Sequence, residues 1–144
     1  MQFTITQAQL GTRPPVVKPD PKVLQFLGED GMRKLISDHY DLLKQSNIKG
    51  LFPPSDEGFE MAKKHSADFF IQICGGPDYF NQSRGAPMMV GRHSAFKITL
   101  EARKIWLESY IKVLSSHDMP EDLKQSFWNY LDIFSMCWVN SPEA

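Results

Sequence analysis

The segment GGPDYFNQSRGAPMMVGRHSAFKITLEARKIWL, residues 75–107, decides the fold because it contains the end of one helix and the start of another. Its opening Gly-Gly-Pro ends a helix, since glycine suits a helix C-terminus and proline cannot continue the helix. Thr99 is a good N-cap for a following helix. Residues 77–98 between these signals predict a long loop with about one helical turn near residues 90–94. A connection of that length in a compact domain is usually functional.

Helical periodicity extends upstream of this segment. A short helix is expected at residues 21–27, ended by the following glycine, and Asp30 is expected to cap a second helix of about 16 residues. Residues 46–55 contain two adjacent prolines and predict a tight connection or a single helical turn. Ser55 or Asp56 then begins another helix. The inward stripes of the two long helices are apolar except for a tyrosine and a serine: Met32, Leu35, Ile36, Tyr40, Leu43, Phe59, Ala62, Ser66, Phe69, Phe70 and Ile73.

Two further helices follow, one beginning at Thr99 and the other opened by Asp118 and Pro120. Residues 1–21 hold four of the ten prolines and show no sustained periodicity, so they predict an extended arm. The sequence therefore predicts an all-α domain at residues 22–144 behind an N-terminal arm at residues 1–21. The inward positions of the two later helices are Ala102, Ile105, Trp106, Tyr110, Val113 and Leu114, then Leu123, Phe127, Tyr130, Leu131, Phe134 and Trp138.

Composition excludes several classes of protein. The 144 residues suit one domain with a single core, and a net charge of -1, from 16 basic and 17 acidic side chains, argues against a nucleic-acid partner. Cys74 and Cys137 lack metal-ligand spacing and are expected to be free thiols. No apolar run approaches the roughly 20 residues of a membrane span, and no secretory signal pattern opens the chain. These features predict a cytoplasmic protein.

Three residues around one turn suit a flat apolar cofactor. The imidazole of His93 can ligate iron, the guanidinium of Arg92 can pair with an acidic edge group, and the ring of Phe96 can pack on the cofactor face. A surface-loop histidine is the alternative, because one histidine is a weak signal. Tyr40 and Trp106 lie on apolar stripes and carry donors that need acceptors, either backbone carbonyls or a bound ligand.

The chain resembles the group II truncated haemoglobins from about residue 26 to its end. The HYDLL motif around Tyr40 and the LFPPSD motif at residues 51–56 extend the resemblance upstream of the central segment. Within that segment and at the C-terminal end, the matching residues are Gly75-Gly76-Pro77, Tyr79, Arg84-Gly85, Pro87, Arg92-His93, Phe96, Ile98, Trp106 and Val139-Asn140-Ser141-Pro142. The resemblance implies a two-over-two helical sandwich of the globin type around haem b.

The resemblance also implies roles for individual residues. His93 would be the proximal iron ligand, with Tyr40 and Trp106 as hydrogen-bond donors on the distal side. Tyr40 or His65 could provide an internal sixth iron ligand, which the sequence leaves open. Family members often carry tyrosine at the position of Phe52 and a larger side chain at the position of Ser66. The remaining haem-pocket residues would be Arg92 near a propionate, with Phe52, Ala62, Ser66, Phe69 and Phe96.

The implied function is binding of oxygen, or of nitric oxide or carbon monoxide, at the haem iron. Two distal donors predict slow oxygen release, which argues against bulk oxygen transport. A haem-based redox enzyme, for nitric oxide detoxification or peroxidase-like turnover, is the alternative. Since the sequence contains no flavin motif, such an enzyme would need an electron-donating reductase as partner. A haem-free helical interaction domain, whose stripes form only a core, is the third possibility.

Overall fold

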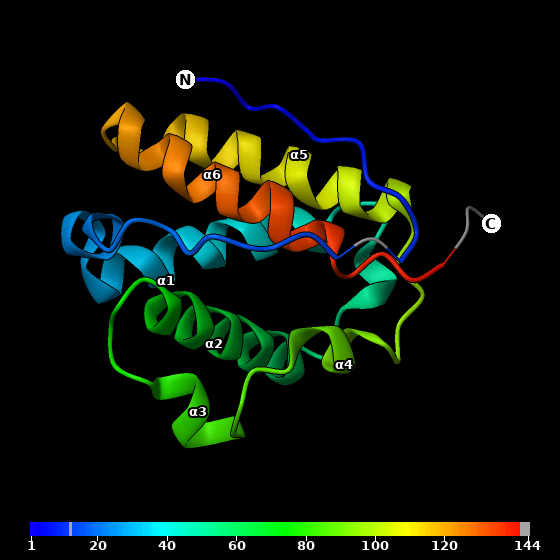
Figure 1. Ribbon diagram of the computed structural model, residues 1–144. Coiled ribbons are helices and arrows are strands. Elements are labelled where there is room, and N and C mark those ends of the chain that lie inside the picture. Colours follow the sequence, from blue (N-terminus) through cyan, green and yellow to red (C-terminus); the bar gives the residue numbers. More distant parts are fainter. Residues whose placement is uncertain (12, 142–144) are drawn as a thin grey trace.

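The computed structural model describes residues 1–11 and 13–141, and within those ranges it contains helices and no strands. Pro142, part of the C-terminal motif above, lies outside the described residues. Figure 1 shows two layers, with α5 and α6 side by side in one layer and α1 and α2 in the other. The all-α, two-over-two architecture expected from the sequence is confirmed. The elements are α1 (Lys22–Lys44), the 3-10 turn η1 (Lys49–Leu51), α2 (Asp56–Ile73), α3 (Tyr79–Arg84), α4 (Met89–His93), α5 (Leu100–Ser116) and α6 (Glu121–Met136).

Helix α1 is interrupted at Gly28, where the sequence predicts the end of a short helix. Gly28 has φ 72° and ψ 170°, a left-handed backbone conformation that glycine adopts without steric penalty. The helix resumes at the next residue. The expectation that Asp30 caps the second part is therefore wrong, because Gly28 already occupies the boundary and Asp30 lies inside the first turn.

The N-termini of α2 and α5 confirm the capping residues expected from the sequence. The hydroxyl of Ser55 accepts a hydrogen bond from the backbone N–H of Gly58 at 3.0 Å. The hydroxyl of Thr99 accepts one from the N–H of Ala102, also at 3.0 Å. Each such cap contributes about 1 kcal/mol and fixes where the helix begins. Thr99 thereby sets the register that places Trp106 on the inner face of α5.

Residues 77–98 contain more helix than the sequence indicates. Helix α4 overlaps the single turn expected near residues 90–94, but α3 was expected to be loop. Helix α3 is six residues long and buries only Phe80. So short a helix has no apolar periodicity to detect, which explains the error.

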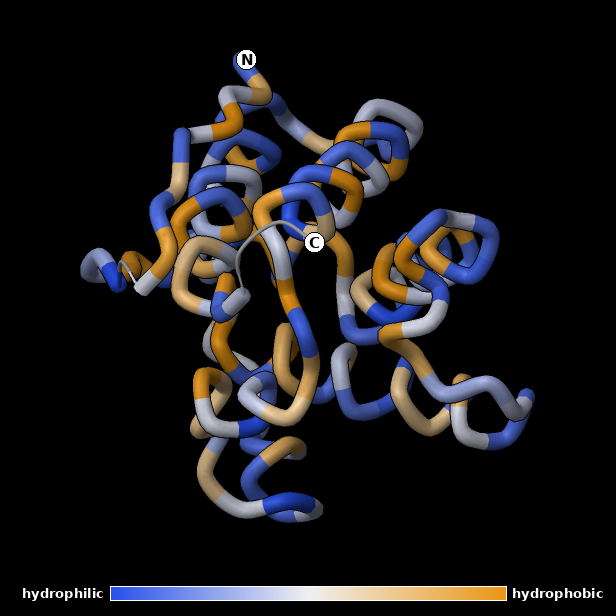
Figure 2. Tube along the Cα trace, turned by 90° about the vertical axis from the view of Figure 1, so that its right-hand side faces the viewer, coloured by the Kyte–Doolittle hydropathy of each residue, from blue (hydrophilic) through white to orange (hydrophobic). Residues whose placement is uncertain are grey.

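The core lies between the two layers and is rich in aromatic side chains. Figure 2 shows hydrophobic and hydrophilic residues alternating around the long helices, as expected when one face of each is buried. Trp128, Tyr110 and Phe127 are the largest fully buried side chains. Cys74 and Cys137 are both free, the first buried and the second half-buried. Within residues 1–11 and 13–141, no helix has the length and apolar character needed to cross a membrane.

The N-terminal arm runs along the outside of the α5–α6 layer (Figure 1). The carboxylate of Asp132 on α6 accepts hydrogen bonds from the backbone N–H of Thr6 at 2.9 Å and from its hydroxyl at 2.6 Å. The indole N–H of Trp128 donates to the carbonyl of Thr4 at 2.9 Å. Phe3 packs edge-on against the Trp128 ring. These contacts fix the first part of the arm against α6.

Candidate functional site

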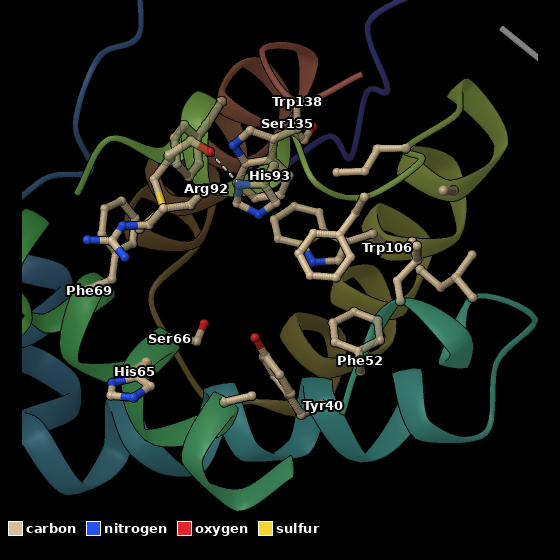
Figure 3. Close-up of a pocket in the computed structure, with 18 of the residues that line it drawn as sticks. Tyr40, Phe52, His65, Ser66, Phe69, Arg92, His93, Trp106, Ser135 and Trp138 are labelled. Atoms are coloured by element: carbon tan, nitrogen blue, oxygen red, sulfur yellow. Dashed lines mark hydrogen bonds between the residues drawn. The ribbon is translucent and has the colours of Figure 1, made fainter. Parts of the chain in front are cut away.

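A cavity of about 360 Å³ opens between the two layers. All nine of the site residues expected from the sequence line it, which brings together residues from α1, α2, α4, α5 and the connections between them. Figure 3 shows the hydroxyl oxygens of Tyr40 and Ser66 entering the cavity from the side opposite His93, and Trp106 on the wall between His93 and Tyr40. The nine residues are Tyr40, Phe52, Ala62, Ser66, Phe69, Arg92, His93, Phe96 and Trp106.

His93 is the last residue of α4, and of its two ring nitrogens Nδ1 is hydrogen-bonded to the backbone of the same helix. Nδ1 lies 2.6 Å from the backbone carbonyl oxygen of Met89. A carbonyl oxygen only accepts, so Nδ1 carries the proton and Nε2 keeps its lone pair. Burial lowers the pKa of His93, although its hydrogen bond to Met89 opposes the shift. The result is a neutral imidazole whose Nε2 can act as a metal ligand.

Tyr40 and Ser66 provide hydroxyl groups on the opposite wall. Burial raises the pKa of Tyr40, and a hydrogen bond with the Ser66 side chain partly offsets this shift. The phenol therefore stays protonated near neutral pH and remains a hydrogen-bond donor. Phe52 and Phe59 pack edge-on against the Tyr40 ring, with centroids 5.5 and 5.6 Å away. These contacts hold the phenol in its orientation toward the cavity.

Trp106 is positioned by His39, a fully buried residue of α1. The Nε2 of His39 lies 3.0 Å from the backbone carbonyl oxygen of Trp106, and the two rings meet edge-on with centroids 5.3 Å apart. On its other face the imidazole stacks on Tyr110, with centroids 3.4 Å apart. Burial lowers the pKa of His39 to about 3, so the ring is neutral and Nε2 donates its proton to the carbonyl. His39 thus ties α1 to α5 at the position of Trp106.

Arg92 lines the cavity, but much of its guanidinium group is bonded to the preceding loop. Nε donates to the carbonyl of Pro87 at 2.6 Å, and Nη2 donates to those of Arg84 and Ala86 at 2.8 and 3.0 Å. The side chain therefore braces residues 84–87, a contact that the sequence does not predict. Only part of the guanidinium remains free for an acidic group of a ligand.

Phe96 and His65 lie at the periphery of the cavity. Phe96 is 47% exposed, so part of this residue is available to pack on a bound group. Figure 3 shows the ring of His65 on the outer side of Ser66, turned away from His93. The Nδ1 of His65 is buried and has no hydrogen-bond partner among the residues described. Burial and the charge of Arg84 lower the pKa of His65.

The structure adds residues that the sequence did not assign to the site. Trp138, on the inward stripe expected for the last helix, stacks on His93 with ring centroids 4.4 Å apart. Arg103 and Ser135 also line the cavity. The buried guanidinium of Arg103 donates to Ser135 and to the carboxylate of Asp132. A charged residue is ordinarily expected at the surface, so the sequence argues against burial of Arg103. The one sequence feature that favours its burial is its position between two inward positions of α5.

The fold and the cavity together define a truncated globin, a two-over-two helical sandwich with a ligand pocket between its layers. The chain belongs to the bacterial-like globin family, whose model matches residues 25–140. Members of this family bind haem and gaseous ligands. The resemblance to group II truncated haemoglobins drawn from the sequence is confirmed.

Comparisons with individual proteins agree with the family. The crystal structure of phosphate-bound Hell's gate globin IV superposes with a TM-score of 0.87 at 36% identity, covering 98% of this chain and 89% of that one. Group 2 truncated hemoglobin YjbI of Bacillus subtilis is 26% identical over 121 residues, 83% of this chain and 89% of that protein. Group 2 truncated hemoglobin 3-1 of Lotus japonicus is 33% identical over 81 residues, 56% of this chain and 47% of that protein. The match thus spans less than half the length of the Lotus protein.

Proposed function

We propose that the chain holds haem b in this cavity with His93 as the iron ligand, and binds oxygen or a related diatomic gas beside Tyr40 and Trp106. The observation that carries this proposal is the arrangement of the two walls. A neutral imidazole whose Nε2 is not engaged by the Met89 hydrogen bond lies on one side, two hydroxyl groups lie opposite it, and the indole of Trp106 lies on the wall between them. The family supports the same assignment, because its members bind haem.

The residues of the cavity fit a flat apolar macrocycle with acidic edge groups. Its volume falls within the range of cofactor pockets, and apolar rings contribute most of its wall. Phe69 is buried beside α6, while Phe96 lies at the open edge. Arg84, which lines the cavity and is exposed, is available to pair with a carboxylate, and the neutral imidazole of His65 can donate a hydrogen bond to one. When bound, the haem iron supplies the coordination position at which a diatomic gas is held.

Tyr40 and Trp106 stabilise a ligand that carries partial negative charge. The buried phenol of Tyr40 and the indole N–H of Trp106 would each donate a hydrogen bond to such a ligand, and the mostly apolar wall of the cavity would strengthen both bonds. These donors would favour a ligand that draws negative charge, such as oxygen, over one that draws less, such as carbon monoxide. Each aligned donor contributes about 1–3 kcal/mol, which slows ligand escape by roughly 5- to 150-fold.

Absorption spectroscopy tests the proposal. The protein is purified, loaded with haem, reduced with dithionite and exposed to carbon monoxide. We expect a Soret band that shifts on reduction and again on adding the gas. If no Soret band forms after haem is added, the proposal is overturned and the haem-free interaction domain becomes the better interpretation. Consumption of nitric oxide or peroxide by the same preparation, supplied with an electron donor, then separates gas binding from redox catalysis.

A further inference from the structure

The residue that follows the last helix by two positions lies directly against His93. The indole of Trp138 is nearly parallel to the imidazole, with an angle of 10° between the planes and centroids 4.4 Å apart. This stack covers one face of the ring. The hydrogen bond from Nδ1 to the Met89 carbonyl holds one edge of the same ring. Nε2 is the atom that both contacts leave free.

The Trp138 ring is itself held on two further sides. Phe134 of α6 packs against it at 4.7 Å between centroids and 75° between planes. Trp106 of α5 packs against it at 4.9 Å and 79°. The indole Nε1 is buried and has no hydrogen-bond partner in the part of the chain that the structure describes. Ring packing alone therefore fixes the orientation of this side chain.

The segment after Trp138 is fastened to the loop that follows His93. The side-chain amide of Asn140 donates to the carbonyl of Phe96 at 2.8 Å, and its oxygen accepts from the N–H of Ile98 at 2.9 Å. The backbone N–H of Asn140 also donates to the carbonyl of Ile98 at 3.0 Å. These bonds keep the C-terminal segment and the His93 loop in one fixed arrangement. Trp138 therefore meets the imidazole from a rigid support.

We propose that Trp138 is a positioning residue that sets the rotation of the His93 imidazole and so the direction of its Nε2. This inference rests on the proposed function, in which His93 ligates the iron. The terminal torsion of histidine is broad, so the side chain alone does not select one ring plane. The hydrogen bond to Met89 restrains one nitrogen, and the stacked indole restrains the plane. A ligand held in this way needs no reorganisation when the metal binds.

The indole N–H of Trp138 has no hydrogen-bond partner among the described residues, so the proposal assigns the positioning role to ring stacking and not to hydrogen bonding. If ring stacking is the function, Trp138→Phe keeps it and removes a buried donor that lacks an acceptor. Trp138→Leu keeps the apolar character but removes the stack. A matched control is Trp128→Phe, because Trp128 is also a tryptophan packed against other aromatic side chains but lies outside the cavity and donates to Thr4.

Resonance Raman spectroscopy of the reduced, haem-loaded protein measures the stretching frequency of the iron–histidine bond directly. We expect Trp138→Leu to shift and broaden the iron–histidine stretching band, since the imidazole then samples several ring planes. Trp138→Phe and Trp128→Phe should leave its position and width as in wild type. An unchanged band in Trp138→Leu would overturn the positioning role. If wild type shows no such band, the proposed function itself has failed, so the two failures are distinguishable.

A second measurement needs no substitution and decides the matter if Trp138→Leu does not fold or load haem. The reduced carbon monoxide form is diamagnetic, so proton NMR can detect contacts between rings near the haem. We expect nuclear Overhauser effects between the ring protons of His93 and those of Trp138. Their absence, with both rings assigned, would show that the stack does not persist in the loaded protein and would overturn the proposal.

Discussion

His39 should make the stability of this protein fall measurably in mild acid. Its side chain is 0% exposed, and its only hydrogen bond is the one from Nε2 to the Trp106 carbonyl among the residues described. Protonating Nδ1 would place a charge in the core beside Tyr110, where, within residues 1–11 and 13–141, only the hydrogen bond to Trp106 favours the charged form. Burial accordingly lowers the pKa of His39 from 6.5 to about 3.

The sign and size of the effect follow from linkage between protonation and folding. The unfolded chain takes up a proton near pH 6.5, whereas folded His39 does so only near pH 3. The stabilisation is therefore complete above about pH 6.5 and is lost as the pH falls toward 3. Each pH unit well inside this window removes about 1.4 kcal/mol from the free energy of unfolding. Between pH 6 and pH 4.5 the loss due to this one residue is about 2 kcal/mol.

Chemical denaturation of wild type and His39→Phe over that pH range measures the effect. Phenylalanine keeps an aromatic ring against Tyr110 but cannot take up a proton. Other titrating groups, among them His65 and His93, are common to both proteins and cancel in the difference. We expect the wild type to lose about 2 kcal/mol more than the variant. Parallel pH profiles would refute the reasoning and show that His39 is not held neutral in the folded protein.

Three further substitutions test other parts of the structure. Trp106→Phe removes a distal donor and should speed oxygen dissociation by about 5- to 150-fold in stopped-flow experiments; an unchanged rate would exclude the indole from ligand stabilisation. Gly76→Ala would place a Cβ 2.8 Å from the backbone oxygen of Ile71 and should lower the melting temperature, at a cost of about 1–3 kcal/mol. Thr6→Val deletes the hydroxyl that donates to Asp132 and should cost about 1–3 kcal/mol in denaturant titrations, whereas no change would show that this hydrogen bond adds nothing to stability.

Much of the fold was predictable because local signals and the buried faces agree. Ser55 and Thr99 cap the helices that the sequence assigned to them, and Gly28 interrupts α1 where expected. Tyr40 and Trp106 could be placed inward from helical periodicity alone. Helix α3 could not be predicted, since it has one buried side chain and no period.

The candidate site was predictable in its composition and less so in its contacts. All nine expected residues line one cavity, a result that depended on the family resemblance as well as on the stripes. The bonds of Arg92 to its own loop depend on a backbone path that no pattern encodes. Arg103 is buried because Asp132 and Ser135, within the last two turns of α6, pair with it. Such pairing between distant segments is set by tertiary packing, and the stack of Trp138 on His93 has the same origin.

The most direct test of the central claim is the absorption spectrum of haem-loaded His93→Gly, recorded in the ferrous state with and without added imidazole. If His93 ligates the iron, the variant should show an altered or weakened Soret band, and free imidazole should restore the wild-type spectrum by occupying the vacated position. His117→Gly, which removes a histidine outside the cavity, should match wild type throughout. A His93→Gly spectrum identical to wild type without imidazole would contradict the account and assign the iron to another ligand.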